Sequence, residues 1–298
     1  MSELARQLRD LVRYDSALWR RVFAAGVGRG PSWWVRYSPV LFGLGFGLGL
    51  DAQRTVVRDT LRMILGQRPA WQEARDVGAV FVNFAGAMSD AMLVGCERGY
   101  EPQSHAIGAW HFHEAAQLDR GLIMATAHTA GWDLGGRILR GVQASDVLVV
   151  MEPEADPEAL AIQDSLRARA GTHVVHVGPD PLASLPLLHH LRRRKGVVAM
   201  KFDRIHPTMR ARPVTFFGQS WRVAEGPLQL AAMTGAPIVP VFTRRLGFMR
   251  YECIMMPHIL VPARPSSAEL DQAAQQLAGS LERFARAYPT QWFRFRAD

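Results

Sequence analysis

Short apolar, β-branched runs alternate with helix-length segments from residue 121 onward, and this alternation constrains the fold more than any other feature. The apolar runs occupy 121–127, 146–151, 173–178, 196–203, 213–218, 237–243 and 251–256. Apolar residues at helical spacing fill 132–141, 156–170, 180–195, 224–235 and 267–287. Such alternation predicts an α/β fold with a mixed, mainly parallel central sheet flanked by helices. Because the last runs follow one another closely, we expect part of the sheet to be antiparallel.

The preceding part of the chain has a helical pattern, with apolar residues at helical spacing in 2–25, 52–66 and 69–98. We predict two regions: an N-terminal helical, membrane-associating region at 1–68 and a larger domain at 69–298. The chain has 298 residues, of which 48% are hydrophobic, so it can bury a full core.

A run of twelve apolar residues, PVLFGLGFGLGL, occupies 39–50 and follows Trp33, Trp34 and Arg36. A membrane-spanning helix needs roughly 20 apolar residues, so this run is too short to cross a bilayer. Tryptophans and arginines beside an apolar run are typical of a segment that lies in the membrane interface. A buried core segment explains the run equally well.

The charge balance gives a net charge of +8, which suits nucleic acid or an anionic membrane surface. No nucleic-acid-binding motif accompanies it, so we expect an anionic membrane and no nucleic acid as partner. The two cysteines, Cys96 and Cys253, are far apart in the sequence and predict neither a disulfide framework nor a zinc site. We expect no metal and no cofactor.

One apolar run ends in the sequence ATAHTAGWD, which contains His128 and Asp133. On a continuous helix these residues would point about 140° apart, so they converge only if the chain turns between them. A strand followed by small residues and a helix start provides that turn. A carboxylate bonded to one imidazole nitrogen would leave the other nitrogen as a base, and backbone amides of the turn could hold an oxyanion. A hydrogen-bonded turn histidine without catalytic function is the equally weighted alternative.

No serine or cysteine nucleophile occurs in a G-x-S-x-G setting. The nucleophile is therefore expected to come from a substrate, as when a base deprotonates a hydroxyl that attacks an activated acyl group. With water in place of the alcohol, the same base would give a thioesterase.

Four sequence blocks occur in a fixed order: HTAGWD at 128–133, KFDR with RPVTFFG at 201–218, AEGPLQLAAMTGAPIVPVFTRR at 224–245, and YPTQWFRFR at 288–296. Together they resemble the bacterial lipid A biosynthesis acyltransferase family, which comprises late-acting glycolipid acyltransferases and relatives that acylate phosphatidylinositol mannosides. The resemblance covers roughly residues 70 to 296. It implies a glycerolipid acyltransferase-like fold, with 69–298 as the acyltransferase domain.

The resemblance also implies roles for individual residues. His128 is expected to be the general base, oriented by Asp133 in the family's His-x4-Asp motif. The substrate-binding residues that it implies are Gly131, Trp132, Asp203, Arg204, Phe216, Phe217 and Gly218. Asp203 and Arg204 would shape the acceptor or phosphate side, and the FFG residues would line the site.

The chain departs from the lipid A enzymes after the second strand, where it reads MEPE in place of a Tyr-Arg pair. An acid there, Glu152, is closer to the mannoside-acylating relatives, as is the FDR sequence. Glu152 is either a substrate-binding residue or a solvated loop acid. Arg167 is either a substrate-binding residue or part of a solvated helix face.

These observations predict a membrane-associated O-acyltransferase on the cytoplasmic face of the bacterial inner membrane. It would move a fatty acyl group from acyl carrier protein or coenzyme A to a hydroxyl of a glycolipid or related amphiphile. The alternatives are an acyl thioesterase and a non-catalytic lipid- or carrier-protein-binding module of the same fold. The sequence leaves open the acceptor, the chain length, the choice of donor and the oligomeric state.

Overall fold

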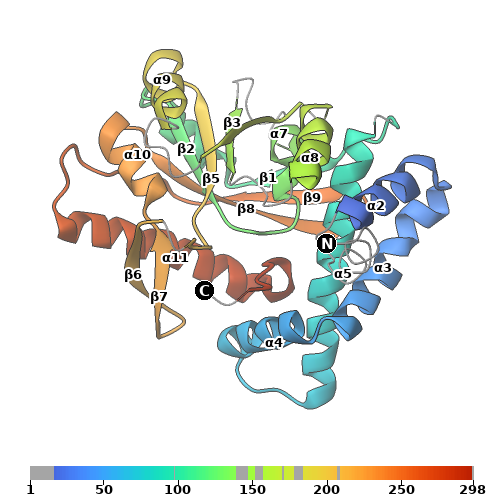
Figure 1. Cartoon of the computed structure of the whole chain (residues 1–298). Coiled ribbons are helices and arrows are strands. Elements are labelled where there is room, and N and C mark those ends of the chain that lie inside the picture. Colours follow the sequence, from blue (N-terminus) through green and yellow to red (C-terminus); the bar gives the residue numbers. More distant parts are fainter. Residues whose placement is uncertain are drawn as a thin grey trace, which may run out of the picture.

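The structure is a computed structural model that describes residues 17–96, 98–138, 147–151, 157–169, 171–177, 184–206 and 209–296. The N-terminal helices lie together beside a central sheet that has helices on its faces (Figure 1). The C-terminal segment after the last helix lies between the N-terminal helices and the sheet, where the turn Pro289–Gln291 contacts both.

The N-terminal helices are α2 (Ala17–Arg29), α3 (Ser32–Gly49), α4 (Asp51–Leu65) and α5 (Ala70–Gly95). The apolar run at 39–50 lies in α3, which packs along α5. A Cβ atom at Gly43 would lie 2.7 Å from the Cα of Val82, so glycine lets the two helices approach closely. One face of α3 is buried and the other is exposed, so the buried-core interpretation of the run holds for one face only.

Among the helices that the structure describes, α5 alone is long and apolar enough to cross a membrane. Of its most apolar window, 56% is buried within the protein. A core helix has the same properties, so this helix is weak evidence for a membrane span.

The central sheet contains β1 (Gln103–Ile107), β2 (Leu122–Thr126), β3 (Val147–Met151), β4 (His173–His176), β5 (Val197–Lys201), β8 (Ile238–Gly247) and β9 (Arg250–Met255). Its strand order is β1-β9-β8-β2-β5-β3-β4, and every neighbouring pair is parallel except β8 with β9. The predicted mixed, mainly parallel sheet is confirmed. The sequence patterns missed β1, which lies at the sheet edge and is mostly exposed.

The run at 213–218 does not join the central sheet. It lies in a separate antiparallel hairpin formed by β6 (Ala211–Phe216) and β7 (Gln219–Ala224). The strand β7 was also missed in the sequence, because its first residues are polar and exposed.

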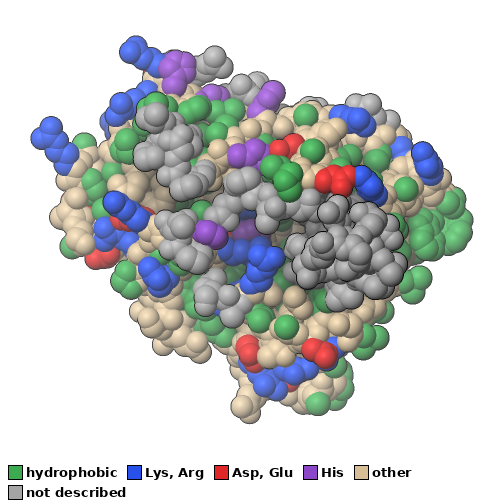
Figure 2. Space-filling view, viewed as in Figure 1, with side chains coloured by type: hydrophobic (Ala, Val, Ile, Leu, Met, Phe, Trp, Pro, Cys, Tyr) green, Lys and Arg blue, Asp and Glu red, His purple; other side chains and the backbone are tan. Residues whose placement is uncertain are grey.

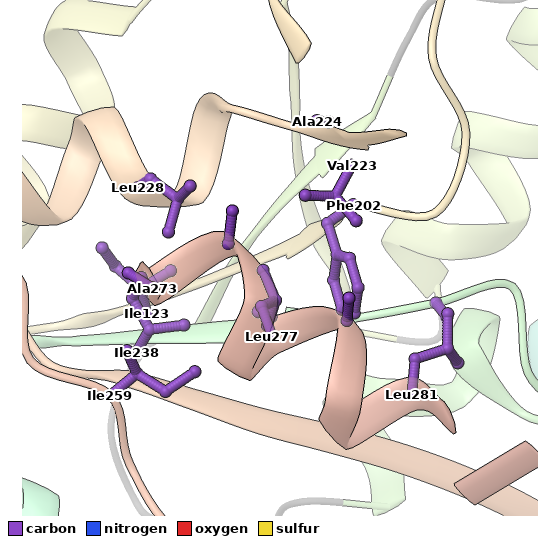
Figure 3. Packing of buried hydrophobic residues seen from close by; sticks show 14 of the residues in the cluster. Ile123, Phe202, Val223, Ala224, Leu228, Ile238, Ile259, Ala273, Leu277 and Leu281 are labelled. Atoms are coloured by element: carbon purple, nitrogen blue, oxygen red, sulfur yellow. The ribbon is translucent and has the colours of Figure 1, made fainter. Parts of the chain in front are cut away.

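The remaining helices are α6 (Ala109–Ala116), α7 (Gly135–Ile138), α8 (Pro157–Arg169), α9 (Leu185–Arg194), α10 (Gly226–Thr234) and α11 (Ser267–Ala287). A capping box of Ser266 and Glu269 begins α11. Leu277 of α11 packs toward Ile123 of β2 and Ile238 of β8 in the largest buried cluster (Figure 3). This core covers one face of the sheet and fixes the central strands.

A buried polar network joins α5 to the antiparallel end of the sheet. Asp90 is fully buried and accepts hydrogen bonds from Arg245 Nε at 2.8 Å, Tyr251 Oη at 2.7 Å and the Met249 amide at 3.2 Å. Burial and the charge of Asp90 raise the pKa of Tyr251 well above 10, so its hydroxyl stays protonated and donates. A paired buried charge of this kind is costly to disrupt, so the network holds the N-terminal helices against the sheet.

Candidate active site

His128 lies just past the carboxyl end of β2, in the middle of the parallel part of the sheet. The C-terminal segment holds the loop on which it lies: the Phe293 amide donates to the His128 carbonyl at 2.7 Å, and the Ala130 amide donates to the Gln291 carbonyl at 3.1 Å. The Thr129 hydroxyl oxygen also accepts from the Thr243 amide of β8 at 3.2 Å. In α/β sheets ligands bind at this edge, and here the loop is fixed from two sides.

The imidazole of His128 is held by Asp203. The Nδ1 atom lies 2.8 Å from Asp203 Oδ1, and the His128 amide donates to Oδ2 at 3.0 Å. Trp292 Nε1 also donates to Oδ2, at 2.8 Å. Since the carboxylate accepts at Nδ1, the proton resides there and Nε2 is left with a lone pair. The arrangement produces an oriented base.

The protonation states follow from burial and charge. Burial lowers the pKa of His128 below its ordinary 6.5, against the opposing effect of Asp203. Burial alone would raise the pKa of Asp203, but the charges and hydrogen bonds of His128, Arg204 and Trp292 outweigh it and hold that pKa well below its usual range. At neutral pH the imidazole is uncharged and the carboxylate is ionised, as a general base requires.

Asp133 does not contact the imidazole, so the predicted bond between Asp133 and His128 is wrong. Its Oδ1 accepts from Arg167 Nε at 3.2 Å, and its buried Oδ2 has no hydrogen-bond partner in the described part of the chain. The left-handed Gly131 (φ 87°) and the short turn Trp132–Leu134 carry Asp133 toward α8. Asp203 is the partner of the imidazole instead. Thr126 of β2 pairs with Lys201 of β5, so His128 and Asp203, each two residues farther along, lie side by side.

Gly131 and Trp132 have different surroundings. A Cβ atom at Gly131 would lie 2.7 Å from the ring of Tyr251, so this position needs glycine both for its backbone angle and for space. The indole of Trp132 lies beside the imidazole of His128, with 5.8 Å between ring centroids. Lys201 Nζ lies 3.7 Å from the centroid of the same indole. Gly131 therefore shapes the turn, and Trp132 belongs to the site.

An apolar cavity opens beside this indole, on the sheet face opposite α11. It holds about 570 Å³ of empty space, a volume that includes the part open to solvent. The side chains with polar groups that line it, here called its polar side, are those of Thr126, Trp132, Lys201 and Thr243. The other lining residues are mostly apolar and come from the sheet strands and the start of α7: Met124, Gly135, Val147, Val149, Val150, Ala199, Met200, Val241 and Cys253.

The FFG residues lie in the β6–β7 hairpin and its turn. Phe216 is buried and packs against Trp292, with 5.6 Å between centroids, so it reaches the site only through that tryptophan. Phe217 and Gly218 form the tight turn of the β6–β7 hairpin, both with positive φ. The ring of Phe217 lies under Arg286. Of the three, Phe216 contacts a residue that bonds to Asp203, and the substrate-binding role of all three stays a prediction.

Arg167 is buried against Asp133, so it does not lie on a solvated helix face. Arg204 follows Asp203 and donates to the Phe293 carbonyl at 2.8 Å. Lys and Arg side chains lie close to His side chains near the middle of one face of the molecule (Figure 2). Glu152 lies outside the described residues.

The model of the family described as bacterial lipid A biosynthesis acyltransferase matches residues 27–297. The chain belongs to this family. The sheet, the His128 loop and the C-terminal segment all fall within the matched range.

Two curated relatives of this acyltransferase family member carry the name phosphatidylinositol mannoside acyltransferase, from Mycobacterium tuberculosis strains ATCC 25618 / H37Rv and CDC 1551 / Oshkosh. Each is 25% identical over 190 residues, which cover 62% of this chain and 56% of the relative. The chain thus aligns with little more than half the length of these relatives.

Among solved structures, the chain is similar to the 1-acyl-sn-glycerophosphate acyltransferase PlsC from Thermotoga maritima. The similarity has a TM-score of 0.38 and 15% identity and covers 86% of this chain and 97% of that one.

Sequence reasoning overlooked two side chains at the site of this acyltransferase family member, Lys201 and Trp292. Both lie in blocks that carried the family resemblance, KFDR and YPTQWFRFR. The signal that could have found Trp292 is its place in the aromatic-rich segment after the last helix, within one of the family blocks. Lys201 could have been noticed as a charged residue that ends an otherwise apolar strand.

Proposed function

We propose that this protein is a membrane-associated O-acyltransferase. His128 Nε2 removes the proton from an acceptor hydroxyl, and the oxygen attacks the carbonyl carbon of an acyl thioester. The carbon–sulfur bond then breaks, and the proton passes from the imidazolium to the departing thiolate. The observation that supports this most is the oriented, uncharged imidazole of His128, which Asp203 holds. It lies beside Trp132, a residue that lines the apolar cavity, in a member of an acyltransferase family.

Asp203 has two functions in this mechanism. It fixes the imidazole tautomer, and its negative charge stabilises the imidazolium that forms during attack. These two effects make it the partner that we assign to His128, in place of Asp133. Trp292 fixes the carboxylate in turn.

The fatty chain of the donor is proposed to occupy the apolar cavity. The thioester carbonyl would then lie at the polar side of the cavity near Trp132, within reach of His128. A chain seated there excludes water from the reacting atoms. The donor is an acyl thioester of acyl carrier protein or coenzyme A.

The acceptor is proposed to be the hydroxyl of a glycolipid with an anionic head group. The relatives named for phosphatidylinositol mannoside acylation favour this class, and the basic side chains on the face in Figure 2 suit a phosphate-bearing head group. Such lipids are reached from a membrane surface, which we propose to be the cytoplasmic face of the inner membrane.

The exposed face of α3 is proposed to lie in that surface. Trp33, Tyr37, Leu41, Leu44 and Leu48 are all 46% exposed or more, and their spacing of three or four places them on one side of the helix. Hydrophobic side chains gather at the edge where α3 lies, at the right in Figure 2. An exposed apolar stripe of this kind is typical of an interfacial helix.

Replacing Leu41 and Leu48 together with aspartate should reduce sedimentation of the purified protein with anionic liposomes. Each substitution places a charge where the bilayer would receive an apolar side chain. Leu260→Asp is the matched control, because Leu260 is 55% exposed and lies after β9, away from α3. Added salt should weaken wild-type binding by screening surface charge. Unchanged binding by the double variant would contradict the role of α3.

The choice between transferase and hydrolase can be tested by thiol release from an acyl thioester, with and without a panel of glycolipid acceptors. We expect slow release by the protein alone and much faster release with a suitable acceptor, with acylated lipid identified by mass. An acyl chain that fills the apolar cavity would exclude water and disfavour it as the nucleophile. Rapid hydrolysis that no acceptor accelerates would establish the thioesterase alternative. If the protein bound lipid or acyl thioester but turned over no thioester, the non-catalytic binding module would be the correct alternative.

A further inference from the structure

Lys201 is a cation at the polar side of the apolar cavity, and the mechanism above does not use it. It ends β5, next to Thr126 of β2 in the parallel register, and it lines the cavity with Trp132. The chain has only two lysines, at positions 195 and 201, among 35 basic residues. A compact ammonium thus stands beside the proposed acyl pocket of a chain that uses arginine almost everywhere else.

The surroundings of Lys201 hold it in place as a cation. Its Nζ lies over the indole of Trp132 at 3.7 Å, a cation–π contact that needs the charged form. The carboxylates of Asp133 and Asp203 also favour that form. Asp133 contributes a buried Oδ2 that has no hydrogen-bond partner among the described residues, so its charge is only partly compensated by Arg167.

Lys201 and His128 lie around the same indole. The imidazole centroid lies 5.8 Å from the indole centroid, and the Lys201 Nζ lies 3.7 Å from it. The distance between the imidazole centroid and the Nζ atom is therefore at most the sum of the two, 9.5 Å. A hydroxyl within about 3 Å of the imidazole and a carbonyl oxygen within about 3 Å of the ammonium can bond to one carbon within that span. The base and the cation can therefore act on the same carbonyl group.

We propose that the Lys201 ammonium binds the carbonyl oxygen of the acyl thioester and stabilises the negative charge that develops there during attack. This role rests on the proposed acyl transfer. When the hydroxyl oxygen adds to the carbonyl carbon, the carbonyl π electrons move to the oxygen that faces Lys201. When the carbon–sulfur bond breaks, those electrons return and the thiolate leaves. Lys201 keeps its proton throughout.

This role also gives a function to the motif residues Trp132 and Asp133. Trp132 contacts Lys201 and the charge of Asp133 attracts it, so we assign both as positioning residues for the cation. A preorganised donor in a water-poor site acts strongly on a developing oxyanion, and losing one such donor typically costs about 10²- to 10³-fold in kcat.

The charge state of Lys201 predicts a pH dependence. Burial lowers its pKa to about 8; Asp133 and Asp203 oppose that shift, and Arg204 and Arg167 add to it. His128, which is uncharged at this pH, also faces it. Because the protonated lysine is the active form, kcat should fall as pH rises through about 8.

The test compares Lys201→Met with Lys195→Met in acyl transfer to a glycolipid acceptor that wild type uses. Methionine keeps the length of the side chain and removes its charge. We expect Lys201→Met to lower kcat by about 10²- to 10³-fold and to leave the KM for the acyl thioester nearly unchanged. Lys195 is exposed, at the end of α9, and its substitution should have no effect.

Two further readouts separate catalysis from a structural role. In Lys201→Ala, added ethylammonium should restore part of the lost kcat by occupying the vacated position. Lys201→Arg should remove the loss of activity above about pH 8, because arginine stays charged. Thermal melting of each variant checks folding. A structural counter-ion would lower the melting temperature without amine rescue and without moving the pH profile.

The role of Lys201 would be overturned if the folded Lys201→Met variant kept the wild-type kcat. It would also be overturned if neither ethylammonium nor arginine at position 201 changed the loss. In both cases the proposed acyl transfer would stand. Failure of wild type to acylate any acceptor would instead refute the proposed function, and the role of Lys201 with it.

Discussion

His128→Asn is expected to lower kcat for acyl transfer by about 10²- to 10⁴-fold, the usual cost of losing a general base. The asparagine amide can still donate to Asp203 near the position of Nδ1, while the nitrogen that accepts the proton is gone. Single-turnover assays with acyl thioester and glycolipid measure the effect directly. His128→Ala should lose as much activity and should also leave Asp203 with one hydrogen bond fewer.

The control is the melting temperature of each variant. The His128 loop is held by backbone hydrogen bonds to residues 291 and 293, which do not involve the His128 side chain. Both variants should melt close to wild type. A folded variant that transfers acyl groups at the wild-type rate would contradict the mechanism. In wild type, transfer should persist below pH 6.5 because burial lowers the pKa of His128, and it should fall only when the imidazole gains a proton.

Asp203→Asn is expected to cause a loss of similar size, up to about 10⁴-fold, because an amide in place of the carboxylate favours the wrong imidazole tautomer. The asparagine NH₂ group would donate to Nδ1, and the proton would move to Nε2, where it blocks base catalysis. The shape of the residue is kept, so packing against Trp292 should survive. Steady-state kcat and the melting temperature together measure this.

Asp133→Asn is the matched comparison. Its side chain can still accept a hydrogen bond from Arg167, and it does not contact the imidazole, so we expect a smaller loss than for Asp203→Asn. The remaining loss would come from weaker positioning of Lys201. If Asp133→Asn were the more damaging change, Asp133 would regain the role of partner to His128.

The periodicity of the sequence was sufficient for the class of fold. Each central strand is buried by helices, so its apolar run is nearly continuous and stands out between helical segments. The two strands that were missed, β1 and β7, have exposed polar residues and lack that signal. The start of α11 was recognisable because local chemistry sets it, through the capping box of Ser266.

The sequence by itself determined the parts of this protein that depend on neighbouring residues: the alternation of strands and helices, the family blocks, and the position of His128 at a strand end. The tertiary structure decided which carboxylate meets the imidazole. Asp133 is five residues away in the chain but turns toward Arg167, whereas Asp203 is 75 residues away and arrives because β5 pairs with β2 in register. The same holds for Trp292 and Lys201, which strand pairing and the returning C-terminal segment bring to the site. Sequence spacing fixes such contacts only along one element, and a site at the edge of a parallel sheet gathers residues from several elements.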